Sequence, residues 1–97
     1  MKKDVKTVSK FRAYILLRLS HVGSEWDVCE RIKKIFPRER VDYACPVYGA
    51  WDIVIEVTFE ELNQLDEVVT KIREDGMLKE VTEETTTMVA ARNTYPW

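Results

Sequence analysis

The chain has 97 residues, of which 45% are hydrophobic and 33% are charged, and its formal net charge is −2. This length supports one compact core and leaves no room for a second domain, and the acidic balance disfavours DNA binding by this chain alone, because nucleic-acid-binding domains of this size are usually basic. The longest uninterrupted apolar run, residues 13–17, is far shorter than the roughly 20 residues that a membrane-spanning helix needs.

The first predicted element is a strand over residues 11–19, which follows a polar arm, residues 1–10, that carries four lysines. Apolar side chains recur at every second position of this strand, and a period of two is typical of a half-buried strand. Tyr14 and Leu16 lie on the opposite face of the same strand. We therefore expect both faces of the sheet to need cover.

A helix is predicted to begin at Ser24, which resembles an N-cap and is followed by the acidic Asp27 in the first turn. Apolar residues then recur at spacings of three and four on one stripe, until Pro37 ends the helix. A second strand follows over residues 41–47. Because Pro46 has no N–H for a hydrogen-bond ladder, this strand belongs at the edge of the sheet.

Gly49 and Ala50 then turn the chain into a third strand over residues 53–57, whose nearly continuous apolar run is typical of a central strand. A second helix is predicted to start from a capping box formed by Thr58 and Glu61, and apolar residues at helical spacing carry it to about residue 73. Beyond an aspartate-glycine pair that ends this helix, many β-branched residues between positions 78 and 91 predict a fourth strand, polar enough for an edge.

The order strand, helix, strand, strand, helix, strand predicts an α+β domain over residues 11–91 with the ferredoxin-like βαββαβ fold. Its antiparallel sheet has the strand order 4-1-3-2, with two helices on one face. The other face exposes Tyr14, Leu16 and Val54, an apolar patch that we expect to form the interface of a homodimer. Residues 92–97 form a tail too short for an element of its own.

Three connections, over residues 20–24, 48–51 and 75–79, are predicted to lie at one end of the sheet, where loops can build a binding site. Free N–H groups at the start of the first helix can receive a carboxylate, and the carboxylate of Asp52 can hold an ammonium group. Together these groups would provide the minimal chemistry for binding an amino acid. The alternative is that Asp52 caps its own turn while the nearby aromatic rings pack.

Few other residues point to chemistry. His21 is the only histidine, and no catalytic partner for it is evident. Cys29 and Cys45 fall at apolar positions without metal-ligand spacing, which favours buried thiols, a reduced cytoplasmic setting and no metal or cofactor. The basic run over residues 31–40 would suit a phosphate, but basic side chains at the end of a helix also complement its dipole, and we favour this structural interpretation.

The segment Val47–Val57, VYGAWDIVIEV, resembles the part of the Lrp/AsnC effector domain, also called the RAM domain, in which a glycine, an aromatic residue and an aspartate precede an apolar strand. The order of elements from Ala13 to Ala90 is similar too, and this span is about four-fifths of the chain. The resemblance implies a domain that dimerises through its sheet, assembles into higher oligomers and binds amino acids between dimers. The ligand-binding residues that it implies are Tyr48, Gly49, Ala50, Trp51 and Asp52, with Thr85 and Thr87 from a neighbouring dimer.

The predicted function is that of a stand-alone RAM-type regulatory module, not an enzyme, which binds a small effector of the amino-acid class and modulates transcription. One alternative is a pure interaction partner of a full-length Lrp/AsnC regulator, with no ligand. A less favoured alternative is a small ferredoxin-like monooxygenase, which would need a working acid or base. His21 alone would have to supply it.

Overall fold

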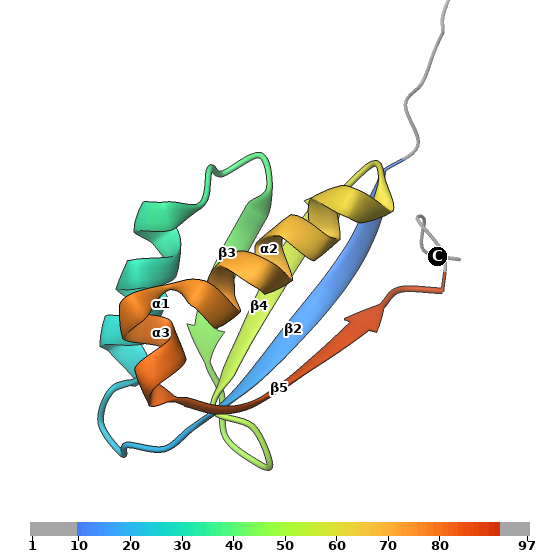
Figure 1. Ribbon diagram of the computed structural model, residues 1–97. Helices are drawn as coiled ribbons and strands as arrows, with labels where there is room; N and C mark the ends of the chain where they lie inside the picture. Colours follow the sequence, from blue (N-terminus) through green and yellow to red (C-terminus); the bar gives the residue numbers. More distant parts are fainter. Residues whose placement is uncertain (1–9, 92–97) are drawn as a thin grey trace, which may run out of the picture.

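The computed structural model describes residues 10–91, in which three helices cover one face of a four-stranded antiparallel sheet (Figure 1). The elements in chain order are β2 (Phe11–Leu19), α1 (Glu25–Ile35), β3 (Val41–Pro46), β4 (Ile53–Phe59), α2 (Leu62–Glu74), α3 (Gly76–Val81) and β5 (Thr82–Val89). The strands lie in the order β3-β4-β2-β5, which confirms the predicted ferredoxin-like arrangement. No helix within this described range is long and apolar enough to cross a membrane. Residues 1–9 of the predicted arm and the tail, residues 92–97, lie outside the described residues.

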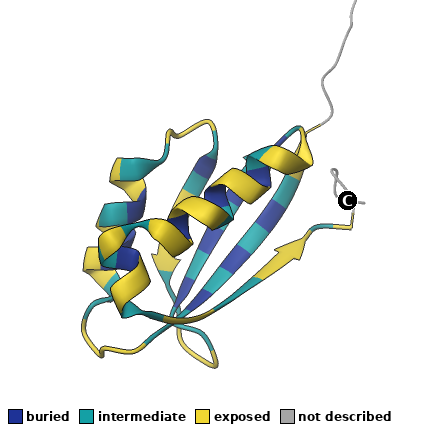
Figure 2. Cartoon of the chain, in the orientation of Figure 1, coloured by how far each residue is buried: buried dark blue, intermediate teal, exposed yellow. Residues whose placement is uncertain are grey.

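The core forms between the helices and the two central strands. Burial alternates along β2 and β4 (Figure 2), because every second side chain of a strand points to the same face. The strand residues that point to the helices are at most 1% exposed: Ala13, Ile15, Leu17, Ile53, Ile55 and Val57. The helices supply the apolar residues that cover them, chiefly Val28, Ile32, Leu65, Val68, Ile72 and Leu78.

The opposite side of the sheet has no covering helix, and we call it the open face. Leu16 and Val54 are directly paired between β2 and β4, and Val54 also pairs with Cys45 of β3. Tyr14 is paired with Met88 of β5. These positions share one face because directly opposed residues of antiparallel strands point to the same side. The open face therefore carries an apolar band with members from all four strands, in the same rows as the polar Glu56 and Thr86.

The second helix starts later than predicted. The capping box forms between Glu61 and Gln64, whose side chain accepts a 3.0 Å hydrogen bond from the N–H of Glu61. Thr58, expected at the cap, is a residue of β4, and its hydroxyl donates to Asp42 Oδ2 at 2.6 Å. The strand continues to Phe59 because that residue pairs with Phe11 of β2. This pairing holds Thr58 in an extended conformation.

The fourth strand also starts later than predicted, since residues 76–81 form the short helix α3. Asp75 is its N-cap and accepts a hydrogen bond from the N–H of Leu78 at 3.1 Å. Arg31 of α1 holds the same carboxylate, with Nη2 2.6 Å from Oδ1, and Leu78 is fully buried. Capping and burial of Leu78 thus favour a helical turn over the strand that the nearby β-branched residues predicted.

Candidate functional site: the hairpin pocket

The predicted connections meet at one end of the sheet, the lower end in Figure 1. The N–H of Leu19, at the end of β2, donates to Asp52 Oδ2 at 2.8 Å, which joins the first loop to the hairpin between β3 and β4. The N–H of Ser20 donates to the carbonyl of Val81 at 2.8 Å, which joins the same loop to the end of α3. Two backbone donors of adjacent residues therefore fix three connections relative to one another.

The hairpin turns at Gly49, whose φ is +125°. Residues other than glycine rarely adopt this conformation. The hairpin closes through a hydrogen bond of 2.9 Å from the N–H of Val47 to the carbonyl of Asp52, and the N–H of Asp52 donates to Leu17 O at 2.8 Å. The turn is thus tied both to its own strand pair and to the central strand β2.

Asp52 has a structural role in this arrangement. Its Oδ2 receives the N–H of Leu19 where the pairing of β2 with β5 shifts, between Arg18 and Leu19. A register shift disrupts the regular ladder, and a carboxylate oxygen can satisfy a backbone donor there. Asp52 therefore caps a neighbouring strand rather than its own turn. Within residues 10–91 only one of its two carboxylate oxygens accepts a hydrogen bond.

Arg18 of β2 contacts the other side of the hairpin, at Ala50 and Trp51. Its Nε donates to the carbonyl of Ala50 at 3.1 Å, and its Nη1 lies 2.5 Å from Glu84 Oε1 on β5. The guanidinium carbon lies 4.8 Å from the centroid of the Trp51 ring, a cation–π distance. Ala50 and Trp51 are therefore engaged with Arg18.

A pocket lies between the first turn of α1 and the hairpin, with a volume of about 510 Å³. We call it the hairpin pocket, and its lining residues are Glu25, Trp26, Cys45, Pro46, Val47, Tyr48, Gly49 and Asp52. Three of the predicted ligand residues, Tyr48, Gly49 and Asp52, thus line one pocket, whereas Ala50 and Trp51 do not. A volume of this size is typical of sites for small molecules.

Thr85 and Thr87 do not come near the hairpin pocket within one chain. They lie on β5 and pair with Leu17 and Ile15 of β2, while the pocket lies beside β3 at the other edge of the sheet. The prediction placed them in the site as contributions from a neighbouring dimer, and that prediction stands untested.

Five lining residues were not predicted from the sequence: three at the end of β3, namely Cys45, Pro46 and Val47, and two on α1, namely Glu25 and Trp26. Trp26 is 70% exposed even though it is a large aromatic residue near the start of a helix. A signal for it exists, because Trp26 lies outside the buried stripe that runs through Val28, Cys29 and Ile32. An aromatic residue that does not point to the core, next to a predicted loop cluster, indicates a binding surface.

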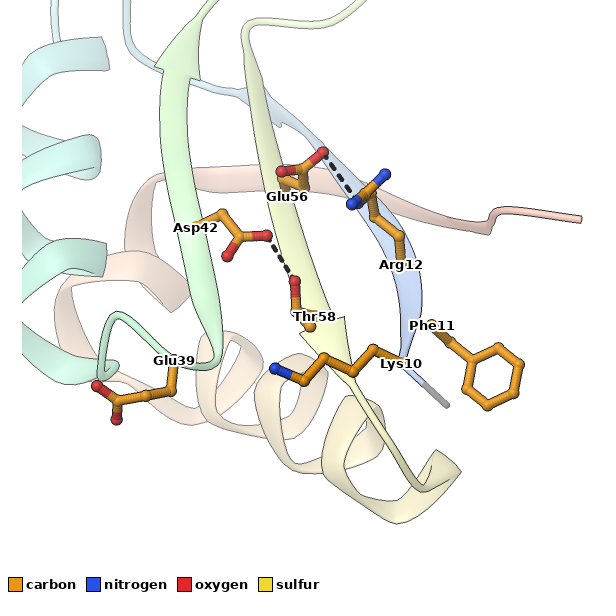
Figure 3. Close-up of a pocket in the computed structure, with 7 residues that line it drawn as sticks. All are labelled: Lys10, Phe11, Arg12, Glu39, Asp42, Glu56 and Thr58. Atoms are coloured by element: carbon orange, nitrogen blue, oxygen red, sulfur yellow. Dashed lines mark hydrogen bonds and ion pairs between the residues drawn. The ribbon is translucent and has the colours of Figure 1, made fainter. Parts of the chain in front are cut away.

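A second cavity of about 500 Å³ lies at the other end of the sheet. Figure 3 shows two pairs of its polar side chains facing each other: Thr58 donates to Asp42, and Arg12 Nε lies 3.6 Å from Glu56 Oε2. Lys10 and Glu39 also line it. Because this cavity mixes both signs of charge, and four of its polar side chains already interact in pairs, it favours a charged ligand less than the hairpin pocket does.

The remaining candidates have local roles. The Nδ1 atom of His21 lies 3.0 Å from the Oγ of its neighbour Ser20, which agrees with a polar residue at the end of a strand. Cys29 is buried, and burial is the main cause that raises the pKa of its thiol to about 11. Cys45 is exposed, so its predicted burial is wrong. The reason is that Cys45 points to the open face, where no helix covers the sheet.

The basic run is partly used inside the fold. Arg31 forms an ion pair with Asp75, and Arg40 donates to the carbonyl of Thr58 at 2.6 Å. The hydrogen bond from Arg31 is the main cause that lowers the pKa of Asp75 below its ordinary range. These contacts support the structural interpretation of this segment.

Comparison with solved structures identifies the family. The chain matches the crystal structure of FFRP-DM1, a protein of the Lrp/AsnC (FFRP) class, with 30% identity and a TM-score of 0.62, and the match covers 82% of this chain and 97% of that one. The chain belongs to the Lrp/AsnC family. The hypothetical protein PHS023 from Pyrococcus horikoshii is similar, with 29% identity, a TM-score of 0.64 and coverage of 84% of this chain and 90% of that one. No family model matches the sequence, and neither does any curated protein.

More distant Lrp/AsnC structures share the fold alone. E. coli AsnC has 17% identity and a TM-score of 0.68, and the match covers 98% of this chain but 62% of AsnC. The transcriptional regulator NMB0573 from Neisseria meningitidis, solved as a complex with L-Met, has 12% identity and a TM-score of 0.59. That match covers 84% of this chain and 50% of the regulator.

Proposed function

We propose that this chain is a non-enzymatic regulatory module that self-associates through its open face, binds an amino acid in the hairpin pocket and thereby modulates transcription. The observation that carries the proposal is that Tyr48, Gly49 and Asp52, the segment resembling the RAM effector turn, line a pocket together with Glu25 and Trp26 of α1. Membership of the Lrp/AsnC family and the L-Met complex of a distant structural neighbour support the same role.

The chemistry of the pocket suits a small amphipathic ligand. Apolar contact surface comes from the aromatic rings of Trp26 and Tyr48 and from the proline and valine at the end of β3. Directed polar contact comes from the carboxylates of Glu25 and Asp52. A small number of placed polar groups within apolar walls is the usual composition of such sites.

Self-association is supported by the apolar band on the open face. Leu16 and Val54 lie at its centre, and Tyr43 and Met88 near its edges are 44% and 49% exposed. Apolar side chains gathered on one uncovered face favour burial against another protein. A two-fold arrangement would let this face cover its own copy.

Isothermal titration calorimetry against the common L-amino acids, with light scattering on the same samples, tests the proposal. We expect heat from at least one amino acid, a mass larger than the monomer, and weaker binding by Asp52→Ala. Asp66→Ala, which changes an exposed aspartate of α2 far along the chain, serves as the matched control. Absence of heat across the panel would contradict the effector role, and a monomeric mass at all concentrations would contradict self-association.

A second candidate function uses the same open face without a ligand: the chain would pair with a full-length Lrp/AsnC regulator. The apolar band supports it, because that band can cover a related sheet as well as its own copy. Mixing the chain with such a regulator and measuring the mass of the complex distinguishes the two. A heterologous complex together with no amino-acid heat would favour this candidate.

A further inference from the structure

The chemistry of the hairpin pocket also indicates which kind of ligand it prefers. We propose that the pocket selects a ligand that carries a primary ammonium or guanidinium group on a flexible chain, that is, a cationic amino acid or an alkyl diamine. The location rests on the proposed function, whereas the preference for a cation rests on the side chains that line the pocket.

The charge in the pocket has one sign. Glu25 and Asp52 are its charged lining residues, and between residues 10 and 91 no lysine, arginine or histidine lines it. Asp52 uses Oδ2 for the N–H of Leu19, and no ion pair of Glu25 occurs within that part of the chain. The nearest strand guanidinium, that of Arg18, already contacts Glu84 and Trp51. Two carboxylates without a counter-charge favour a cationic ligand over a neutral or anionic one.

The aromatic side chains favour the same class of ligand. Tyr48 is fully exposed and Trp26 is 70% exposed, so the ring of each residue is accessible to a ligand group. A cation over an aromatic face is attracted by the quadrupole of the ring. The same hairpin already contains one such contact, because the guanidinium of Arg18 lies 4.8 Å from the ring of Trp51.

The start of α1 does not favour the opposite charge. A helix N-terminus attracts anions through its free N–H groups, but the first turn of α1 already carries the carboxylates of Glu25 and Asp27. Their negative charge weakens the attraction of the helix start for a ligand carboxylate, which the sequence predicted to bind there. The first turn therefore adds to the preference for a cationic group.

Titration calorimetry with three probes tests the preference: L-lysine, L-norleucine, which lacks only the side-chain ammonium, and 1,5-diaminopentane, which lacks the carboxylate. We expect L-lysine to bind about tenfold more tightly than L-norleucine, since one exposed cation–π contact and one screened ion pair each contribute modestly. Higher salt should narrow that ratio.

The variant Glu25→Gln should weaken L-lysine about threefold and leave L-norleucine unchanged, because it removes charge and keeps shape. Glu67→Gln, on the exposed side of α2, is the matched control and should change the affinity for neither amino acid.

Three other outcomes have separate meanings. If L-norleucine binds as tightly as L-lysine, the cation preference is wrong while the amino-acid site stands. If only the diamine binds, the preference is upheld and the amino-acid effector is wrong. If none of the three probes binds, the cation preference is wrong, and the panel of common amino acids alone decides whether the pocket binds an amino acid.

Discussion

Replacing Asp52 with alanine should destabilise the fold as well as the site. The substitution removes the acceptor of the Leu19 N–H, a hydrogen bond of 2.8 Å at a partly buried position. A hydrogen bond to a charged group contributes about 1.5–3 kcal/mol, and we take the lower end because water can partly reach the freed donor. A loss of about 1.5 kcal/mol corresponds to a fall in Tm of roughly 6–12 °C for a domain of this size.

The assay is urea unfolding followed by circular dichroism, with Asp52→Asn as the control variant. Asparagine keeps an oxygen that can accept the Leu19 N–H but removes the negative charge. We expect Asp52→Asn to retain most of the stability and to lose affinity for L-lysine, whereas Asp52→Ala loses both. If Asp52→Ala unfolds at the same urea concentration as the original protein, the assigned role of the Leu19–Asp52 hydrogen bond is wrong.

Three further predictions concern the turn, the α1–α3 ion pair and the open face. Gly49→Ala should destabilise the protein by about 1 kcal/mol or more in the same urea assay, because φ is +125° there, and an unchanged midpoint would argue against this turn conformation. Asp75→Asn should keep the cap of α3 but lose the ion pair with Arg31. Because the pKa of Asp75 is lowered in the folded state, the ion pair stabilises the fold at pH values above the ordinary pKa of 3.8. That stability is lost as the pH falls through the lower pKa of the folded state. The difference in Tm between Asp75→Asn and the unchanged protein should therefore be present at neutral pH and shrink in acid. A difference that does not depend on pH would refute the assigned role of the ion pair. Leu16→Glu should convert the assembly to monomers in sedimentation velocity, because it buries a charge in the interface. The control Leu62→Glu, at an exposed position on α2, should leave the mass unchanged. Equal masses of the two variants would exclude the open face as the interface.

Much of the fold could be predicted from local pattern because the periods of apolar residues differ between strand and helix. The alternation through β2 and the apolar run of β4 assigned the central strands, and Pro46 assigned the edge. The two wrong boundaries have a common cause. Thr58 and residues 78–81 were interpreted from their own propensities, whereas tertiary contacts, the Phe11–Phe59 pairing and the buried Leu78, decide their conformations.

The site was predictable only in part. Tyr48, Gly49 and Asp52 belong to one short turn, so a sequence motif can find them. Trp26 joins them from a helix that starts more than 20 residues earlier, and only the packing of α1 against β3 brings the two together. The sequence also does not show that Trp51 lies outside the pocket that Tyr48 lines, because this depends on the contact of the Trp51 ring with Arg18 of β2.

The most direct test of the account is a two-dimensional amide NMR titration of the isotope-labelled chain with L-lysine and, separately, with L-methionine. We predict that at least one of them shifts the amide signals of Glu25 and of residues 47–52 and the indole N–H signal of Trp26, and that L-lysine does so at the lower concentration. Signals around the second cavity, such as those of Glu39 and Asp42, should not move. No shift with either amino acid, or shifts confined to the second cavity, would contradict the claim that the hairpin pocket is the effector site.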